Sequence, residues 1–186
     1  MNFPLCPRFQ AVLFDMDGTL LDTLSDMQDA VNHILLENGW PQRTLEEIRA
    51  FVGNGAARLM ERAIPEPIAP QRFQEILSTY KDWYQAHNCV KTAPYPGISE
   101  VLAELEKMGV KTAVVSNKPD ATTKALAEKF FPGMPALGQR DGVDPKPSPA
   151  LVAQALSALG VRPENAVYVG DSEVDVATAR NAGLPL

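Results

Sequence analysis

The residues Ala11-Val12-Leu13-Phe14-Asp15-Met16-Asp17-Gly18-Thr19 give the first indication of how this 186-residue chain folds. Four consecutive apolar residues are typical of a strand that is buried on both faces of a parallel sheet. Two carboxylates and a glycine follow the strand directly. Because ligands of open parallel sheets bind beyond the carboxyl ends of the strands, this stretch predicts a functional site as well as a strand.

Two later apolar runs, Val110–Val115 and Ala166–Val169, repeat the pattern of the first. Ser148-Pro149 predicts the start of a helix, and Gly183 predicts a helix end. Strands that alternate with helices indicate the α/β class, here a doubly wound, Rossmann-like parallel sheet. Helices are expected where apolar residues recur three and four positions apart, at residues 98–108, 120–130, 148–159 and 173–182.

The segment from Thr23 to His87 has a different pattern, because no strand-like run interrupts its helical stretches. The first helix is expected to end at Gly39-Trp40-Pro41. We therefore predict an inserted all-helical cap over residues 22–90 and an α/β core formed by residues 1–21 and 91–186. Further helices are expected at residues 44–51, 55–64 and 71–87, with prolines separating the last two.

Composition excludes several classes of protein. With 45% apolar and 22% charged residues the chain is expected to fold, and its net charge of −6 without a Lys/Arg run argues against nucleic acid or an anionic membrane as partner. The chain has neither a long apolar run nor a signal-like N-terminus, so we expect a cytoplasmic protein. Cys6 and Cys89 stand far apart, which predicts reduced thiols rather than a disulfide or a zinc site.

The ends of the three predicted strands bring carboxylates and a hydroxyl to one crevice. Lys146 lies in a loop just before a helix N-terminus, which also favours anions. Oxygen ligands with room for a phosphate suit Mg²⁺ better than Zn²⁺. An isolated Asp-x-Asp-Gly would be read as a turn and an isolated lysine as solvated, so the prediction depends on the joint pattern. The polar residues that follow the strands are Asp15, Asp17, Ser116, Asn117, Lys118, Asp171 and Asp175.

In their order along the chain, these residues resemble the four motifs of the haloacid dehalogenase superfamily, in its phosphatase branch with a helical cap. Asp15-Met16-Asp17-Gly18-Thr19 resembles the nucleophile motif, and Ser116 and Lys146 resemble the second and third motifs. Gly170 and Asp171 through Asp175 resemble the acidic fourth motif. The resemblance runs from Gln10 to the last residue, and Asp17 distinguishes the chain from a dehalogenase, which lacks this second carboxylate.

The resemblance implies hydrolysis of a phosphate monoester in two steps through an aspartyl-phosphate. Asp15 would be the nucleophile and Asp17 the general acid and base. Ser116, Asn117 and Lys146 would bind the phosphoryl oxygens. Mg²⁺ would be held by Asp15, the Asp17 carbonyl and Asp171, with Asp175 as a ligand or a supporting partner.

The segment Gly53-Asn54-Gly55 resembles the cap segment of phosphoglycolate phosphatases, and its backbone N–H groups could contact a substrate carboxylate. An ordinary turn between two helices explains the same residues equally well. Phosphoglycolate is therefore the leading substrate, within the expectation of a small phosphorylated metabolite and a monomer or homodimer. His33 and His87 are expected to pack or face solvent, and Lys118 either adds positive charge or is solvated.

Two alternatives stay open. The first is a sugar-phosphate phosphatase or phosphomutase of the same superfamily. The second is a non-catalytic binding protein, because relatives normally continue beyond the segment that matches Arg180-Asn181-Ala182-Gly183 with a further strand. A truncated chain of this kind would keep affinity for Mg²⁺ and phosphate without releasing phosphate.

Overall fold

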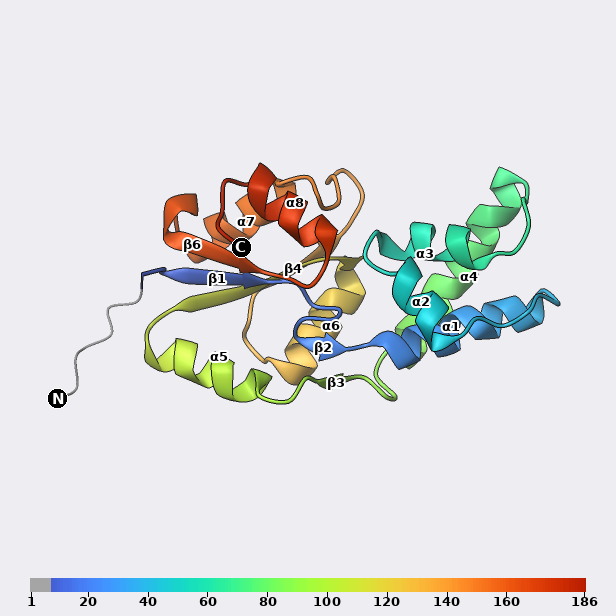
Figure 1. The fold of residues 1–186 in the computed structure, drawn as a ribbon, viewed down its shortest axis with the longest axis horizontal. Coiled ribbons are helices and arrows are strands. Elements are labelled where there is room, and N and C mark those ends of the chain that lie inside the picture. Colours follow the sequence, from blue (N-terminus) through green and yellow to red (C-terminus); the bar gives the residue numbers. More distant parts are fainter. Residues whose placement is uncertain (1–7) are drawn as a thin grey trace. The chain divides into compact units, whose positions relative to one another are not determined.

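The structure is a computed structural model that describes residues 8–186, so Cys6 lies outside the described residues. The chain forms two compact units (Figure 1). One comprises the described residues up to Leu21 together with Pro94–Leu186, and the other comprises Asp22–Ala93. The candidate chemistry at the strand ends belongs to the first unit.

The first unit is built on a four-stranded sheet in the order β5-β4-β1-β6, and all neighbouring strands are parallel. Phe14 at the end of β1 lies opposite Val169 at the end of β6 and opposite Val114 of β4. Strand β4 continues to Pro119, so its second half extends beyond the ends of β1 and β6 at the same edge of the sheet. The predicted α/β class with a parallel sheet is confirmed. The strands are β1 (Ala11–Phe14), β4 (Lys111–Pro119), β5 (Ala136–Gln139) and β6 (Ala166–Val169).

Helices cover both faces of this sheet. Helices α5 (Ile98–Lys107) and α6 (Asp120–Phe130) lie on one face, and α7 (Ala150–Leu159) and α8 (Glu173–Asn181) lie on the other (Figure 1). A 3-10 turn, η1 (Pro163–Asn165), leads into β6. The buried core between the sheet and the α7 and α8 layer includes Leu13, Val115, Leu151, Ala155 and Tyr168.

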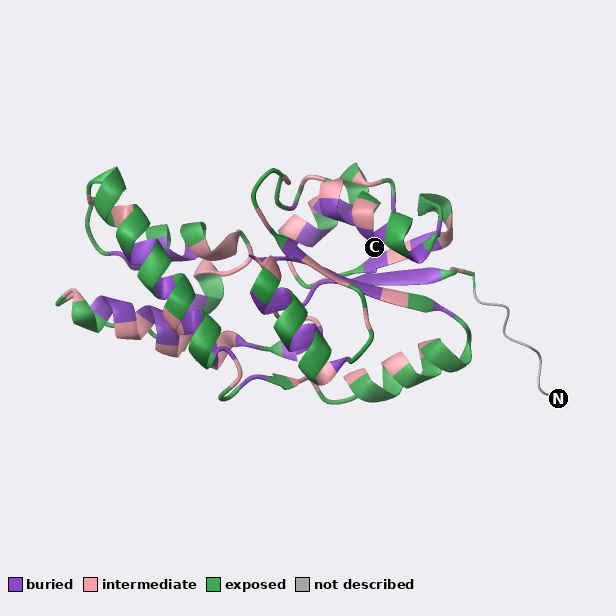
Figure 2. Cartoon of the chain, turned by 180° about the vertical axis from the view of Figure 1, so that it is seen from behind, coloured by how far each residue is buried: buried purple, intermediate pink, exposed green. Residues whose placement is uncertain are grey.

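Strands β1 and β4 are the continuously buried strands of this sheet (Figure 2). All four residues of β1 are buried, as are the six central residues of β4. Continuous burial is the physical reason for apolar runs without alternation, since side chains on both faces of the strand leave water.

The second unit is helical, with a core of its own that includes Ile34, Ile48, Met60 and Tyr80. Pro70 is the first residue of α4, where the missing N–H of proline costs no hydrogen bond. No helix in the described part of the chain is both long and apolar enough to span a membrane. The helices are α1 (Leu24–Glu37), α2 (Leu45–Phe51), α3 (Gly55–Ala63) and α4 (Pro70–His87).

The chain crosses between the units twice, through the short paired strands β2 (Leu21–Asp22) and β3 (Ala93–Pro94). Beside the crossing, the buried carboxylate of Asp26 accepts hydrogen bonds from the backbone N–H groups of Val90, Lys91 and Thr92. The Thr92 hydroxyl donates a fourth bond at 2.7 Å. This carboxylate fixes the end of the helical unit to its beginning.

Three predictions about elements need correction. Strand β5 was not predicted, because its sequence Ala-Leu-Gly-Gln is short and weakly apolar. Strand β4 continues to Pro119, so Ser116, Asn117 and Lys118 lie within the strand rather than beyond its end. Helix α7 begins at Ala150 with Pro149 as N-cap, two residues later than predicted, although the Ser148 hydroxyl still accepts a bond from the Ala150 N–H.

Candidate active site

The candidate site lies at the carboxyl ends of β1, β4 and β6. Asp15 follows β1 directly, and its N–H donates to the Val169 carbonyl at 2.9 Å, which continues the parallel pairing by one residue. The chain then turns, since the N–H groups of Leu20 and Leu21 both donate to the Met16 carbonyl. This turn places the Asp17 side chain near the end of β4 rather than along a continued β1.

The buried ammonium of Lys146 is the electrostatic centre of the site. Its Nζ atom lies 2.9 Å from Oδ1 of Asp15 and 2.7 Å from Oδ1 of Asp175, and its side chain is 2% exposed. Burial by itself would lower the pKa of Lys146, but Asp15, Tyr168 and Asp175 raise it above its ordinary value. Lys146 is therefore a permanent cation, and the prediction that an isolated lysine would be solvated does not apply.

Asp15 has an unusual environment for a carboxylate. Burial, with contributions from Asp175 and Asp17, raises the pKa of Asp15 to about 6 although Lys146 acts in the opposite direction. One carboxylate oxygen also accepts a hydrogen bond from the Met16 N–H at 2.7 Å. An ionised Asp15 is thus held in place by one cation and one backbone donor, at a substantial cost in solvation.

Asp175 and Tyr168 are two buried residues that contact the Lys146 ammonium. Asp175 forms a capping box with Ser172 at the start of α8, in which each residue's side chain accepts from the other's backbone N–H. Although burial opposes it, contact with Lys146 and hydrogen bonds from Ser172 lower the pKa of Asp175. The Tyr168 hydroxyl lies 3.2 Å from both Lys146 Nζ and Asp175 Oδ1, and 3.1 Å from the Val115 carbonyl.

Three carboxylates are close enough to share a metal ion. Oxygen atoms of Asp15, Asp171 and Asp175 all lie within 4.8 Å of one another. Asp171 is exposed, and its Oδ1 atom accepts a bond from the Thr19 hydroxyl at 3.3 Å. Gly18 allows this approach, because it has a φ of +82° and a Cβ atom there would lie 2.2 Å from Asp171 Oδ2. All of the donor atoms are oxygens, and the three carboxylates together carry two or three negative charges. Such a set of donors fits a hard divalent cation.

Asp17 is paired with Lys118. The Nζ atom of Lys118 lies 2.9 Å from Oδ1 and 3.1 Å from Oδ2 of Asp17, and the Lys118 side chain is 2% exposed. The interpretation of Lys118 as a solvated side chain is therefore wrong, and the alternative of added positive charge at the site is the one that agrees with the structure.

Asn117 and Ser116 are both buried in β4, but their side chains have different partners. The Asn117 amide donates to the Lys146 carbonyl at 3.0 Å and accepts from the Lys146 N–H at 2.7 Å. The Ser116 hydroxyl accepts a bond from the Lys118 N–H at 3.2 Å. The Asn117 side chain thus fixes the loop that carries Lys146, a relation between residues 29 positions apart that no local pattern indicates.

The segment Gly53-Asn54-Gly55 belongs to the helical unit, where Asn54 is the N-cap of α3 without a side-chain capping bond. Gly53 and Gly55 have φ values of +112° and +82°, which explains glycine at both positions. Nearby, Arg58 pairs with Glu61, and Arg62 donates to the Phe51 carbonyl.

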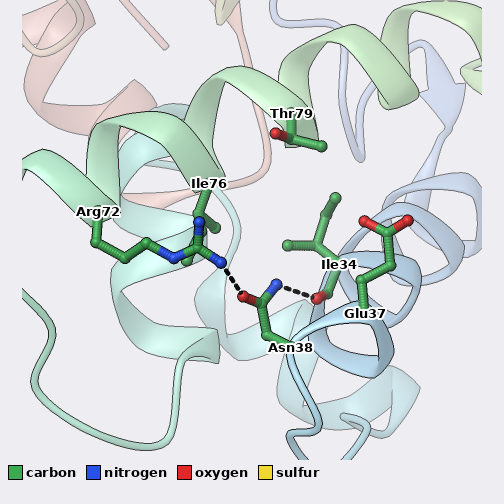
Figure 3. Close-up of a pocket in the computed structure, with 6 residues that line it drawn as sticks. All are labelled: Ile34, Glu37, Asn38, Arg72, Ile76 and Thr79. Carbon is green, nitrogen blue, oxygen red and sulfur yellow. Dashed lines mark hydrogen bonds between the residues drawn. The ribbon is translucent and has the colours of Figure 1, made fainter.

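A pocket of about 440 Å³ also lies in the helical unit, between α1 and α4 (Figure 3). Arg72 donates to Asn38, and Asn38 donates to the Ile34 carbonyl, so the polar groups of this pocket partly satisfy one another. The residues that line it include none of those predicted to form a site. His33 and His87 both stack on Trp83, in agreement with their predicted packing role.

Of the residues in the site, the sequence analysis missed Tyr168 and left the role of Lys118 open. Tyr168 was assigned only to a buried strand, yet its hydroxyl contacts both Lys146 and Asp175. A tyrosine within an otherwise apolar run is a usable signal, because a buried hydroxyl requires a partner. Lys118 carried a similar signal, as a cation two residues beyond Ser116 in what the structure shows to be one strand.

The fold and this acidic cluster define an α/β protein whose polar site lies at the carboxyl ends of parallel strands. A model of the haloacid dehalogenase-like hydrolase family matches residues 12–186. The chain therefore belongs to the haloacid dehalogenase-like hydrolase family, and the resemblance inferred from its motifs is confirmed.

Several relatives of this chain are phosphoglycolate phosphatases. The phosphoglycolate phosphatase of Pseudomonas putida is 35% identical over 183 residues, which cover 93% of this chain and 66% of that protein. This chain thus spans about two thirds of the length of that relative. A crystal structure of a candidate phosphoglycolate phosphatase from Lactobacillus delbrueckii subsp. bulgaricus has a TM-score of 0.88 at 35% identity, with 95% of this chain and 84% of that chain covered.

A second crystal structure is that of the CbbY protein of Rhodobacter sphaeroides in complex with xylulose-(1,5)bisphosphate. It has a TM-score of 0.74 at 27% identity, and the match covers 95% of this chain and 84% of that chain. The relatives named here are thus phosphatases or bind a phosphorylated compound. Membership of a hydrolase family is thus shown, and the names of these relatives support the prediction of a phosphatase.

Proposed function

We propose that this protein is a Mg²⁺-dependent phosphatase that hydrolyses a small phosphate monoester through an aspartyl-phosphate on Asp15. The observation that carries the proposal is the contact of the Asp15 carboxylate with the buried Lys146 ammonium at 2.9 Å, beside Asp171 and Asp175. A nucleophile and a fixed cation at this distance can engage the same phosphoryl group from two sides.

In the first step an Asp15 oxygen attacks phosphorus, and the bond from phosphorus to the ester oxygen breaks. Asp17 gives its proton to that oxygen, so the alcohol leaves neutral. Lys146 neutralises charge on the phosphoryl oxygens, and the Ser116 hydroxyl and nearby backbone N–H groups are proposed to bind them. Asn117 contributes by holding the Lys146 loop through its two side-chain hydrogen bonds.

In the second step a water molecule attacks the phosphorus of the aspartyl-phosphate. Asp17, now a carboxylate, takes a proton from this water, and the Asp15 carboxylate leaves as inorganic phosphate forms. The same group therefore acts as acid and then as base, which returns both aspartates to their starting states.

Mg²⁺ is the cofactor that the donor set favours. When bound, the ion would supply charge neutralisation at the phosphate and would keep Asp15 ionised. Asp15, the Asp17 carbonyl and Asp171 are the proposed ligands. Asp175 is proposed as a supporting partner, since both of its oxygens already accept hydrogen bonds from Lys146 or Ser172.

Phosphoglycolate is the leading substrate, supported by the identity of 35% to the Pseudomonas putida phosphoglycolate phosphatase. We propose that the helical unit serves as a cap and that Gly53, Asn54 and Gly55 contact the substrate carboxylate. The phosphorylated sugar bound by the Rhodobacter sphaeroides relative makes a sugar-phosphate substrate the second candidate.

Phosphate release from 2-phosphoglycolate, a hexose phosphate and p-nitrophenyl phosphate, each with Mg²⁺ and with EDTA, tests this function. We expect Mg²⁺-dependent release that is fastest from phosphoglycolate. Asp15→Asn should reduce release below detection, whereas the control Asp141→Asn, which changes an exposed carboxylate, should leave it unchanged. Binding of phosphate and Mg²⁺ without release by the folded wild-type chain would support the non-catalytic alternative instead.

A further inference from the structure

Lys118 occupies a position that the proposed reaction does not yet explain. It contributes a second buried ammonium, on β4 and at the same end of the sheet as Lys146. Burial of a lysine side chain removes its hydration and freezes several torsions, so a lysine at 2% exposure requires a compensating partner. That partner is the carboxylate of Asp17.

The geometry of the contact restricts Asp17 strongly. Lys118 Nζ lies 2.9 Å from one Asp17 oxygen and 3.1 Å from the other, so the ammonium holds both oxygens at once. The Asp17 side chain is 14% exposed, so it is not fully buried. A carboxylate held at two oxygens has less rotational freedom than one held at a single oxygen.

The backbone of Lys118 is fixed within β4 by hydrogen bonds and by close packing. Its N–H donates to the Ser116 hydroxyl at 3.2 Å, and its carbonyl accepts from the Thr123 hydroxyl at 3.2 Å. Gly138 of the neighbouring strand lies so close that a Cβ atom there would be 2.6 Å from the Lys118 carbonyl oxygen. The lysine therefore extends from a strand position that packing fixes on two sides.

We infer that Lys118 is a positioning residue that keeps the Asp17 side chain oriented toward the leaving oxygen. In the acid form one Asp17 oxygen stays on the Lys118 ammonium and the other carries the proton that passes to the leaving oxygen, and once the proton has left both oxygens contact Lys118 as they do in this structure. This inference rests on the proposed function. A residue that binds the phosphoryl group would affect the hydrolysis of every substrate. A residue that acts through Asp17 should affect only those substrates whose hydrolysis needs Asp17.

The consequence is a dependence on the leaving group. An alkyl phosphate needs a proton on its leaving oxygen, whereas p-nitrophenolate is a weak base that leaves without one. Because kcat/KM reports the steps up to phosphoryl transfer to Asp15, loss of a well-oriented Asp17 should lower kcat/KM for the alkyl ester and spare the aryl ester.

The test compares Lys118→Met with Asp17→Asn on the best alkyl phosphate of the substrate panel and on p-nitrophenyl phosphate. We expect Lys118→Met to lower kcat/KM about 10- to 100-fold for the alkyl ester and less than about threefold for the aryl ester, the same selectivity as Asp17→Asn. The control is Lys124→Met, which removes the exposed lysine from its pair with the partly buried Asp120 and should change neither value.

Several outcomes would overturn the inference. Equal losses on both esters with a raised KM would place Lys118 on the phosphoryl group itself, and unchanged kinetics would make the pair purely structural. Thermal unfolding checks that each variant folds. If Lys118→Met does not fold, Lys118→Arg keeps the charge with a different reach and should show a smaller loss of the same selectivity. A wild-type chain that hydrolyses neither ester would contradict the proposed function and this inference with it, whereas the other outcomes contradict the inference alone.

Discussion

At the residue scale, Asp15 combines two opposing requirements. The nucleophile that we propose Asp15 to be must be ionised, yet burial and the neighbouring carboxylates raise the pKa of Asp15 to about 6. Lys146 opposes this shift without cancelling it. A site that holds several carboxylates around one ammonium is destabilised when they are all ionised, and this excess negative charge is what a divalent cation would relieve.

The raised pKa of Asp15 predicts a pH dependence of stability in the metal-free protein. The pKa is about 6 in the folded protein against 3.8 ordinarily, so the folded state binds this proton more tightly. The contribution of Asp15 to stability is therefore complete below about pH 4 and is lost as the pH rises through about 6. Asp15→Asn should be more stable than wild type above pH 7 by on the order of 1 to 3 kcal/mol.

Urea unfolding in EDTA from pH 4.5 to 7.5 measures this effect. The difference between Asp15→Asn and wild type isolates Asp15, because all other titrating groups are common to both proteins. A difference that does not change over this pH range would show that Asp15 titrates at its ordinary value.

At the element scale, helix caps connect stability to the site. The capping box of α8 uses Ser172 and Asp175, and that same Asp175 carboxylate contacts Lys146. Helix α2 has a similar capping box formed by Thr44 and Glu47, but in the helical unit. The two boxes are chemically alike, so only their surroundings distinguish them.

The shared role of Asp175 predicts that Ser172→Ala has two effects. Loss of the cap should cost about 1 kcal/mol of stability, and release of one Asp175 oxygen should weaken Mg²⁺ binding several-fold, as loss of a supporting hydrogen bond usually does. Thr44→Ala is the matched control, with a comparable loss of stability and no change in Mg²⁺ affinity. Thermal unfolding and calorimetric Mg²⁺ titration measure the two effects, and equal Mg²⁺ affinities for the two variants would contradict the prediction.

At the scale of the whole molecule, the helical unit depends on how its two ends are joined. Asp26 near the start of α1 is 2% exposed and accepts from three consecutive backbone N–H groups at residues 90–92. A neighbouring pair, Asp29 with Lys91, joins the same segments at the surface. We expect the buried Asp26 carboxylate to contribute far more to stability than the exposed Asp29–Lys91 pair, because water competes for the charges of the exposed pair.

Asp26→Asn should therefore destabilise the helical unit by about 2 to 4 kcal/mol, since an amide replaces one acceptor oxygen with a donor and leaves buried N–H groups without partners. Asp29→Asn, the matched control, should cost less than about 1 kcal/mol. Both tryptophans, Trp40 and Trp83, lie in this unit, so urea unfolding followed by tryptophan fluorescence reports on it directly. Similar losses for the two variants would show that Asp26 has no special role.

The sequence by itself determined the α/β class, three of the four sheet strands and the four helical stretches of the second unit. Buried parallel strands and amphipathic helices have periods that can be read locally, and proline and glycine mark their ends. Strand β5 was not predicted, because Ala136–Gln139 has neither the length nor the apolar character of a core strand. It forms a strand only because it pairs with β4. Asp15, Ser116 and Asp171 were found because they follow apolar runs closely, whereas Lys146 was found from its place in the loop before a predicted helix and from the resemblance of the motifs.

Only the tertiary structure decided which polar groups contact one another. Lys118 was ambiguous in the sequence, and its pairing with Asp17 joins residues 101 positions apart. The roles of Asn117 and Tyr168 around Lys146 arise in the same way, from parallel strands that bring distant segments to one edge. Local patterns record burial and backbone geometry, whereas a buried charge acquires its partner from whichever segment the sheet places beside it.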